Sequence, residues 1–117
     1  MTNGGVFLAI NSKDKGRRGE REVAKILREA GFENARRGCQ YSGVNGDPDV
    51  VGLPGVHLEV KYRERLDIYG AYEQSRADAK GMEIPWVVHR KNGKPWLCTM
   101  SFEEAILLYR GLVDGER

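Results

Sequence analysis

The sequence predicts a mixed α/β domain with one central sheet flanked by helices. Segments with helix and strand periodicity follow one another in the order helix, strands, helix, strand hairpin, helix. No repeat, low-complexity tract or Pro/Ser-rich linker interrupts them, and 117 residues suffice for one core but not for two. We therefore expect a single domain over residues 1–117, in which residues 1–14 form a loose N-terminal segment.

The first helix is expected over residues 17–30. Val23, Ala24 and Leu27 recur at helical spacing and give it one apolar face, while charged residues cover the other. Gly31 follows as the C-cap, because glycine readily adopts the left-handed conformation that ends a helix.

A β-hairpin is predicted after a turn-rich segment at residues 33–48, which itself has room for a short strand around residues 36–40. The first strand of the hairpin covers residues 49–53 and the second residues 56–62, with a Pro-Gly turn between them. Apolar and polar residues alternate along the second strand, so one side faces the core and the other carries polar groups.

The remaining elements are a second helix over residues 68–80, a second hairpin and a last helix. Strands at residues 86–90 and 95–100 are joined by an Asn-Gly turn, which is a strong hairpin signal. Ser101 and Glu104 form a capping box that opens the last helix, whose apolar residues fall on one face.

The composition argues against several classes of protein. With 40% hydrophobic and 31% charged residues, the chain resembles neither a disordered protein nor a disulfide-rich secreted one. No apolar run approaches the ~20 residues that span a bilayer, and the opening stretch lacks the basic start of a signal peptide. Cys39 and Cys98 fit a cytoplasmic protein with reduced thiols, and His57 and His89 are interpreted as ordinary strand residues.

Positive charge is concentrated in the N-terminal third of the chain. Residues 13–37 hold nine Lys/Arg against five Asp/Glu, a net charge of +4, whereas residues 101–117 hold two against four. This distribution favours a polyanionic partner, although a solvated basic helix face would give the same pattern.

Candidate catalytic residues gather at Asp49 and, ten positions later, at Glu59-Val60-Lys61. Glu59 and Lys61 emerge on one face of their strand, and Asp49 begins the partner strand, which can set its carboxylate beside Glu59. Two converging carboxylates repel each other unless a hard cation binds both, and oxygen ligands suit Mg²⁺ or Mn²⁺. Lys61 would add a positive charge near an activated water.

A third acid, Glu20, lies on the apolar face of the first helix. A carboxylate there is costly without a partner, and the edge of a metal site would provide one. Gly16 and Gly19 flank it and would permit close approach of the backbone. Each motif alone is common in turns and strands, so the combination carries the prediction of a metal-dependent hydrolytic site.

Other residues have competing interpretations. Asp47 is either an additional ligand or, as we prefer, a turn residue before Pro48. Four large aromatic residues could stack on bases, but packing in the core or in a dimer is preferred, and two lysines are assigned to the second hairpin turn. These residues are Tyr69, Tyr72, Trp86 and Trp96, and Lys91 and Lys94.

These motifs resemble the PD-(D/E)XK nuclease superfamily, and residues 15–109 resemble its small Holliday junction resolvase-like members from archaea and phages. The resemblance implies a restriction-endonuclease-like core, magnesium-dependent phosphodiester hydrolysis and a homodimer. It matches Glu20 to the first-helix acid, Asp49 to the metal-binding aspartate, and Glu59 and Lys61 to the second acid and the lysine of the motif.

Two further site residues follow from the resemblance. The carbonyl of Val60 is an expected metal ligand, and Gln74 resembles a helix glutamine near the site of such resolvases. The spacing between the hairpin and the second helix departs from the archaeal enzymes, and so does the last helix. These departures bear on junction specificity more than on nuclease chemistry.

The expected function is that of a metal-dependent, structure-selective DNA endonuclease that resolves four-way (Holliday) junctions. A less selective nicking, flap or duplex nuclease is the first alternative, and a non-catalytic DNA-binding module is the second. The second alternative is disfavoured because a protein that had lost catalysis would not need to keep all four motif residues, Glu20, Asp49, Glu59 and Lys61. We expect DNA and a second copy of the chain as partners, with no membrane and no organic cofactor. Arginines expected to contact DNA phosphates are Arg17, Arg18, Arg36, Arg37, Arg63 and Arg65.

Overall fold

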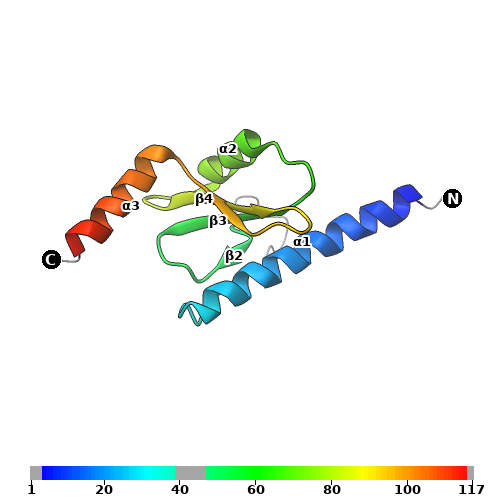
Figure 1. The fold of residues 1–117 in the computed structure, drawn as a ribbon, viewed down its shortest axis with the longest axis horizontal. Helices are drawn as coiled ribbons and strands as arrows, with labels where there is room; N and C mark the ends of the chain where they lie inside the picture. The colour runs from blue at the N-terminus through cyan, green and yellow to red at the C-terminus, as the bar shows by residue number, and fades with distance from the viewer. Residues whose placement is uncertain (1–3, 39–46, 116–117) are drawn as a thin grey trace.

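The computed structural model describes residues 4–38 and 47–115, and this part of the chain contains three helices and a five-stranded mixed sheet (Figure 1). The elements are α1 (Gly4–Glu29), β1 (Arg36–Arg37), β2 (Val50–Val51), β3 (Val56–Tyr62), α2 (Ile68–Asp78), β4 (Ile84–Arg90), β5 (Leu97–Thr99) and α3 (Phe102–Gly115). Their order confirms the predicted α/β class. None of the helices described is long and apolar enough to cross a membrane.

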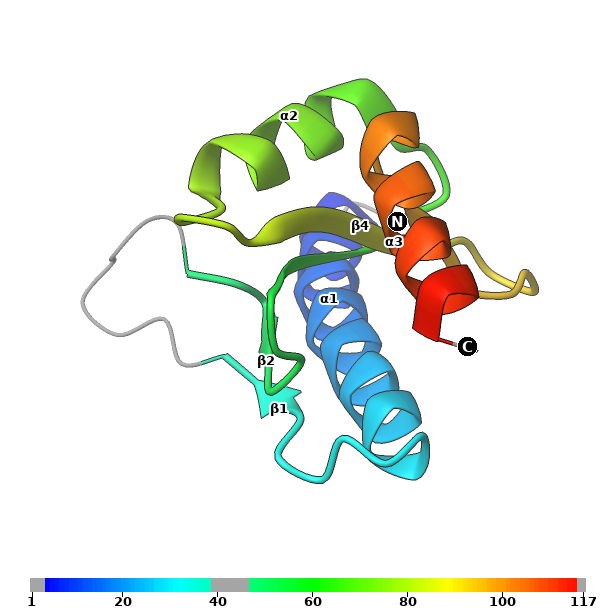
Figure 2. The same ribbon diagram turned by 90° about the vertical axis from the view of Figure 1, so that its left-hand side faces the viewer.

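The sheet has the strand order β1-β2-β3-β4-β5 and mixes both strand orientations. The predicted hairpins β2–β3 and β4–β5 are confirmed as antiparallel pairs. The central strands β3 and β4 run parallel, and α2 forms the crossover between them. As Figures 1 and 2 show, the sheet lies between α1 on one face and α2 on the other.

The core lies between α1 and the sheet. Val23 and Ala24 of α1 pack against Val50, Leu58 and Val60, and all five side chains are buried. The other face of β3 is also covered, because α2 packs across β3 and β4. The polar side of β3 is therefore buried as well, and its polar residues must find partners inside the protein.

Helix α1 is longer than predicted. It begins at Gly4 rather than near residue 17, so residues 4–14, expected as a loose segment, are helical. Apolar periodicity marks only the part of a helix that packs on a core, and the N-terminal part of α1 extends beyond the sheet (Figure 1). The strand expected at residues 36–40 is seen as Arg36–Arg37, and Cys39 lies outside the described residues.

Helix α3 forms as predicted but does not pack as its apolar face suggested. The N-cap half of its capping box is confirmed, since the backbone N–H of Glu104 donates to the Ser101 Oγ at 3.1 Å. The Glu104 carboxylate accepts from the Ser101 hydroxyl at 2.9 Å, whereas a full capping box would have it accept from the Ser101 backbone N–H. No residue of α3 is buried, and the side chains of Phe102 and Tyr109 are 80% and 66% exposed. Figure 1 shows α3 at one end of the molecule, away from α1.

Candidate active site

The β2–β3 hairpin brings Asp49 beside Glu59. Asp49 directly precedes β2, and the pairing of Val50 with Leu58 puts it opposite Glu59. Its backbone N–H donates to the carbonyl of Leu58 at 2.9 Å, and its Oδ2 accepts from the backbone N–H of Val60 at 2.8 Å. The Asp49 carboxylate therefore lies beside β3, just before the first residue of β2.

The pKa of Asp49 is shifted by its burial and by the acids close to it. Burial, and then the negative charge of Glu59, raise the pKa of Asp49 to about 7, with a smaller contribution from Glu20. The hydrogen bond from Val60 N–H opposes this rise without cancelling it. The structure therefore brings Asp49, Glu59 and Glu20, three of the residues expected at the site, into one electrostatic cluster.

Glu20 approaches the site from α1. It is half-buried, and its Oε1 accepts a hydrogen bond from Arg37 Nε at 2.8 Å. Beside it, a Cβ added at Gly19 would lie 3.1 Å from the Tyr62 side chain, so the expected close approach of the backbone is confirmed there. At Gly16 the added Cβ would meet nothing within 4 Å, and the expectation was wrong.

Glu59 has a partner that the sequence interpretation missed. His57 and Glu59 are 1% and 4% exposed, and His57 Nε2 lies 2.9 Å from Glu59 Oε1. Because an ionised carboxylate only accepts, the imidazole donates from Nε2. Burial alone would lower the pKa of His57, but the hydrogen bond to Glu59 and the charges of Glu59, Glu83 and Asp78 raise it above its ordinary value.

Two further acids complete this buried cluster. His57 Nδ1 lies 3.9 Å from Glu83 Oε1, and ligand atoms of His57, Glu59 and Asp78 lie within 4.8 Å of one another, close enough to hold a metal ion. The alternation of β3 places His57 and Glu59 on one face and could have suggested their contact. No local pattern indicates Asp78 or Glu83, which reach the cluster from the end of α2 and the start of β4.

The remaining predicted residues occupy different positions. Lys61 is half-buried on β3 and pairs in register with His89 of β4. Gln74 is exposed on α2, and its participation in the site stays a prediction. Arg37 is half-buried against Glu20, whereas the other predicted DNA-contacting arginines are exposed, namely Arg17, Arg18, Arg36, Arg63 and Arg65.

Aromatic packing agrees with the preferred interpretation for one of the tryptophans. The Trp96 ring packs edge-on against Tyr62 with centroids 5.7 Å apart, and its Nε1 donates to Glu22 Oε1 at 3.1 Å. Tyr69, by contrast, is 81% exposed on α2.

The donor set suits a hard divalent cation. Asp49 is half-buried and Glu59 is buried, and repulsion between the two carboxylates adds to the effect of burial in raising the pKa of Asp49. A cation bound by both would remove that repulsion, and carboxylate oxygens are the ligands preferred by Mg²⁺ and Mn²⁺. The residues present therefore fit such an ion.

The mixed sheet is consistent with a restriction-endonuclease-like core, and its β2–β3 hairpin carries Asp49 opposite Glu59, two residues before Lys61, the arrangement expected of a nuclease of the PD-(D/E)XK class. The family model described as archaeal Holliday junction resolvase (Hjc) matches residues 11–105, most of the chain. The chain therefore belongs to this family, and its membership implies nuclease activity. No curated protein and no solved structure matches the chain.

Proposed function

We propose that the protein is a magnesium-dependent endonuclease that cuts branched DNA, with the four-way junction as its preferred substrate. The observation that carries this proposal is the juxtaposition of Asp49 and Glu59 across the β2–β3 hairpin, in a chain of the junction resolvase family. The coordination of a metal by these residues and the selectivity for branched DNA are the proposed parts.

Each motif residue has a role that its position supports. Asp49 and Glu59 would hold the ion, with Glu20 and the carbonyl of Val60 as further ligands. When bound, the ion would supply an acidified water and neutralise charge on the scissile phosphate. The ammonium of Lys61, on the same face of β3 as Glu59, would orient the attacking water or stabilise negative charge on the phosphate.

The exposed arginines would hold the DNA backbone. Arg17 and Arg18 lie on α1, and the Arg18 guanidinium lies 5.6 Å from the centre of the Tyr62 ring at the end of β3. Arg63 and Arg65 directly follow that end of β3. Contacts of this kind position the substrate without reading its sequence. Arg37 would act differently, because its guanidinium is bound to Glu20.

A homodimer is part of the proposal. A four-way junction presents two symmetry-related strands, and a two-fold pair of sites matches that symmetry. The apolar face of α3 is the best-supported interface, because Phe102, Ile106, Tyr109 and Leu112 are all solvent-exposed in the single chain. The second helix and the second hairpin, considered from the sequence, carry fewer exposed apolar residues.

The test is a substrate panel of labelled four-way junction, flap and duplex of matched sequence, with Mg²⁺, with Ca²⁺ and with EDTA. We expect paired nicks on opposing strands of the junction in Mg²⁺ and no cleavage in EDTA. Ca²⁺ should support binding without turnover, because its looser coordination does not impose the octahedral geometry of Mg²⁺. Equal cutting of all three substrates would instead favour a less selective nuclease, and no cutting would leave a DNA-binding module.

A further inference from the structure

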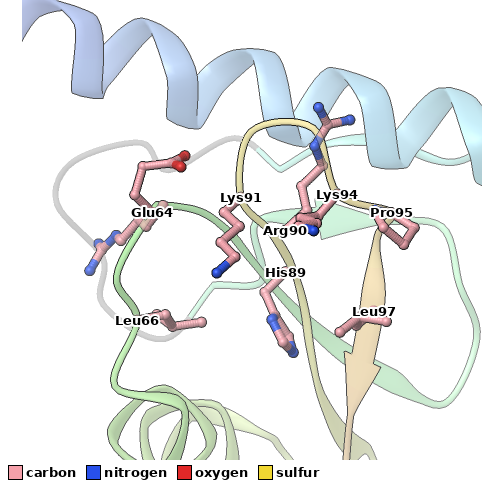
Figure 3. A pocket seen from close by; sticks show the side chains of 9 residues that line it. Glu64, Leu66, His89, Arg90, Lys91, Lys94, Pro95 and Leu97 are labelled. Atoms are coloured by element: carbon pink, nitrogen blue, oxygen red, sulfur yellow. The ribbon is translucent and has the colours of Figure 1, made fainter.

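A hollow of about 310 Å³ lies between the β3–α2 connection and the β4–β5 turn (Figure 3). This volume reaches the lower limit, about 300 Å³, of pockets that hold small ligands. Leu66, Pro95 and Leu97 form its apolar walls. In Figure 3, the His89 ring lies between Leu66 and Leu97, and its Nε2 is 2.9 Å from Thr99 Oγ1.

The rim of the hollow is cationic. Arg63, Lys91 and Lys94 line it and are exposed. Glu64 is the one acid among the lining residues, and its carboxylate is already held by Lys15 Nζ at 2.8 Å and the backbone N–H of Asn92 at 2.9 Å. Lys91 also interacts with the charge of Glu64, but three exposed cations against one acid leave the rim with a net positive charge. The pocket therefore offers apolar walls for a flat ring and a net positive rim for an anion.

Arg90 also lines the hollow but does not add to its positive rim. Its guanidinium turns toward α1, as Figure 3 shows, and donates to Glu22 Oε1 at 3.1 Å and to Tyr62 Oη at 2.8 Å. Burial lowers the pKa of His89, so its ring is neutral at physiological pH and suited to stacking rather than to ion pairing.

The hollow lies within a few nucleotides of the proposed chemistry. His89 on its floor is the register partner of Lys61, and Asp49 lies on the opposite side of β3. His89 and Asp49 lie two strands and two residues apart. With about 4.8 Å between strands and about 3.3 Å per residue along them, His89 and Asp49 are separated by about 12 Å. A DNA strand advances about 3.4 Å per nucleotide along the duplex axis, which makes that separation about three to four nucleotides.

We propose that this hollow is a nucleotide-binding subsite, in which a base unstacked next to the branch point packs against His89, Leu66 and Leu97 while Lys91 and Lys94 hold its phosphates. The inference rests on the proposed function and deepens it. Taking a base out of the stack costs a few kcal/mol in an intact duplex and costs less where the stack is already interrupted, as it is at the branch point. The subsite would therefore favour branched DNA over intact duplex and account for selectivity without reading a sequence.

The test separates the cationic rim from the apolar walls, and it is done in Ca²⁺ so that cleavage is not needed. Lys91→Ala/Lys94→Ala should weaken binding of a four-way junction and reduce the slope of log Kd against log salt by about two. The control Lys25→Ala/Lys80→Ala removes two exposed lysines elsewhere and should leave the slope close to that of the wild type. Equal slopes in the two double variants would overturn the phosphate contacts.

The base contact is tested with 2-aminopurine placed one, two or three nucleotides from the branch point. Wild-type protein should raise its fluorescence at one of these positions, as expected for an unstacked base. Leu97→Ser, at a 57% exposed side chain whose loss should not disturb the fold, should abolish that rise and reduce the preference for junction over duplex several-fold, while keeping the salt slope. No fluorescence change at any position, or an unchanged rise in Leu97→Ser, would overturn the subsite. Either result could occur in an active nuclease, so this failure is distinguishable from failure of the proposed function.

Discussion

Asp49 shows most clearly how burial and neighbouring charge act on the candidate site. Its carboxyl is turned inward by the Val60 hydrogen bond and faces Glu59, and burial with that second charge raises its pKa to about 7. A residue that only closed a turn would not need this cost. A bound cation would neutralise the charge of the ionised pair and so offset the cost of burying the two carboxylates together.

The first prediction concerns the stability of the metal-free protein. Because the pKa of Asp49 is raised from 3.8 to about 7 on folding, the folded state holds its proton over a window in which the unfolded chain has lost it. Stability must therefore fall as pH rises from about 4 to 7, by on the order of a few kcal/mol. Thermal unfolding in EDTA should show a lower Tm at pH 8 than at pH 5.

Two comparisons check the assignment of that slope to Asp49. Asp49→Asn should flatten the fall and raise the Tm at pH 8, because the neutral amide can still accept from Val60 N–H. Asp47→Asn removes a carboxyl two residues away and should keep the wild-type slope. An unchanged slope in Asp49→Asn would show that another group causes it.

The second prediction assigns His57 a positioning role. Its Nε2–H holds one oxygen of Glu59, and such contacts to a metal-ligating carboxylate are typically worth about 10–100-fold in metal affinity. His57→Leu should lose that factor in Mn²⁺ affinity measured by calorimetry without DNA. His57→Gln, which can place an N–H at the same point, should recover most of it.

The outcome for His57 distinguishes three roles. Equal Mn²⁺ affinity in a folded His57→Leu variant would mean that the residue only fills the core. Loss of a tight Zn²⁺ site in both variants would instead indicate that His57, Glu59 and Asp78 are themselves metal ligands.

At the residue scale, the sequence predicted what local geometry determines. Period-two alternation puts Glu59 and Lys61 on one face, and the hairpin puts Asp49 opposite. It could not predict the contacts of His57 with Asp78 and Glu83, because these depend on how the α2 crossover returns to β4. The engagement of Arg37 by Glu20 likewise depends on tertiary packing.

At the element scale, the position of α1 decides whether Glu20 reaches the site. Gly19 makes that approach possible, since an added Cβ would lie 3.1 Å from Tyr62 and 3.2 Å from Trp96. We predict that Gly19→Val destabilises the protein by about 1–3 kcal/mol through overpacking. Gly16→Ala, where space is open, should be neutral or stabilise by up to about 1 kcal/mol.

Denaturant unfolding of the two variants measures the difference. Equal stabilities would mean that α1 is not held closely against β3. The same helix shows the limit of sequence interpretation, because its boundary was predicted from the apolar residues that pack on the sheet. The part beyond the sheet gave no periodic signal from which a helix could be predicted.

At the scale of the whole molecule, α3 and the sheet differ in how far their apolar faces are covered. The hairpins and the crossover helix pack as their periodicity predicts, whereas the apolar face of α3 stays exposed. Periodicity identifies a surface that must be covered but not the molecule that covers it. A second copy of the chain would explain why the apolar residues are there.

We predict that Tyr109→Glu on α3 converts a dimer into a monomer. Tyr69→Glu on α2 is the matched control, since both tyrosines are exposed on helices and the second helix was the interface considered from the sequence. Light scattering at tens of micromolar should give a dimer for wild type and Tyr69→Glu. Dissociation by Tyr69→Glu alone would move the interface to α2, and a wild-type monomer would refute the dimer.

The central claim is that Asp49 and Glu59 form the metal-dependent hydrolytic site. Single-turnover cleavage of a labelled four-way junction by wild type, Asp49→Asn and Glu59→Gln, each in Mg²⁺ and in EDTA, tests it most directly. The predicted result is paired nicking by wild type in Mg²⁺ alone, and a loss of at least about 100-fold in both variants while junction binding persists. Cleavage at the wild-type rate by either variant, or cleavage by wild type in EDTA, would contradict the claim.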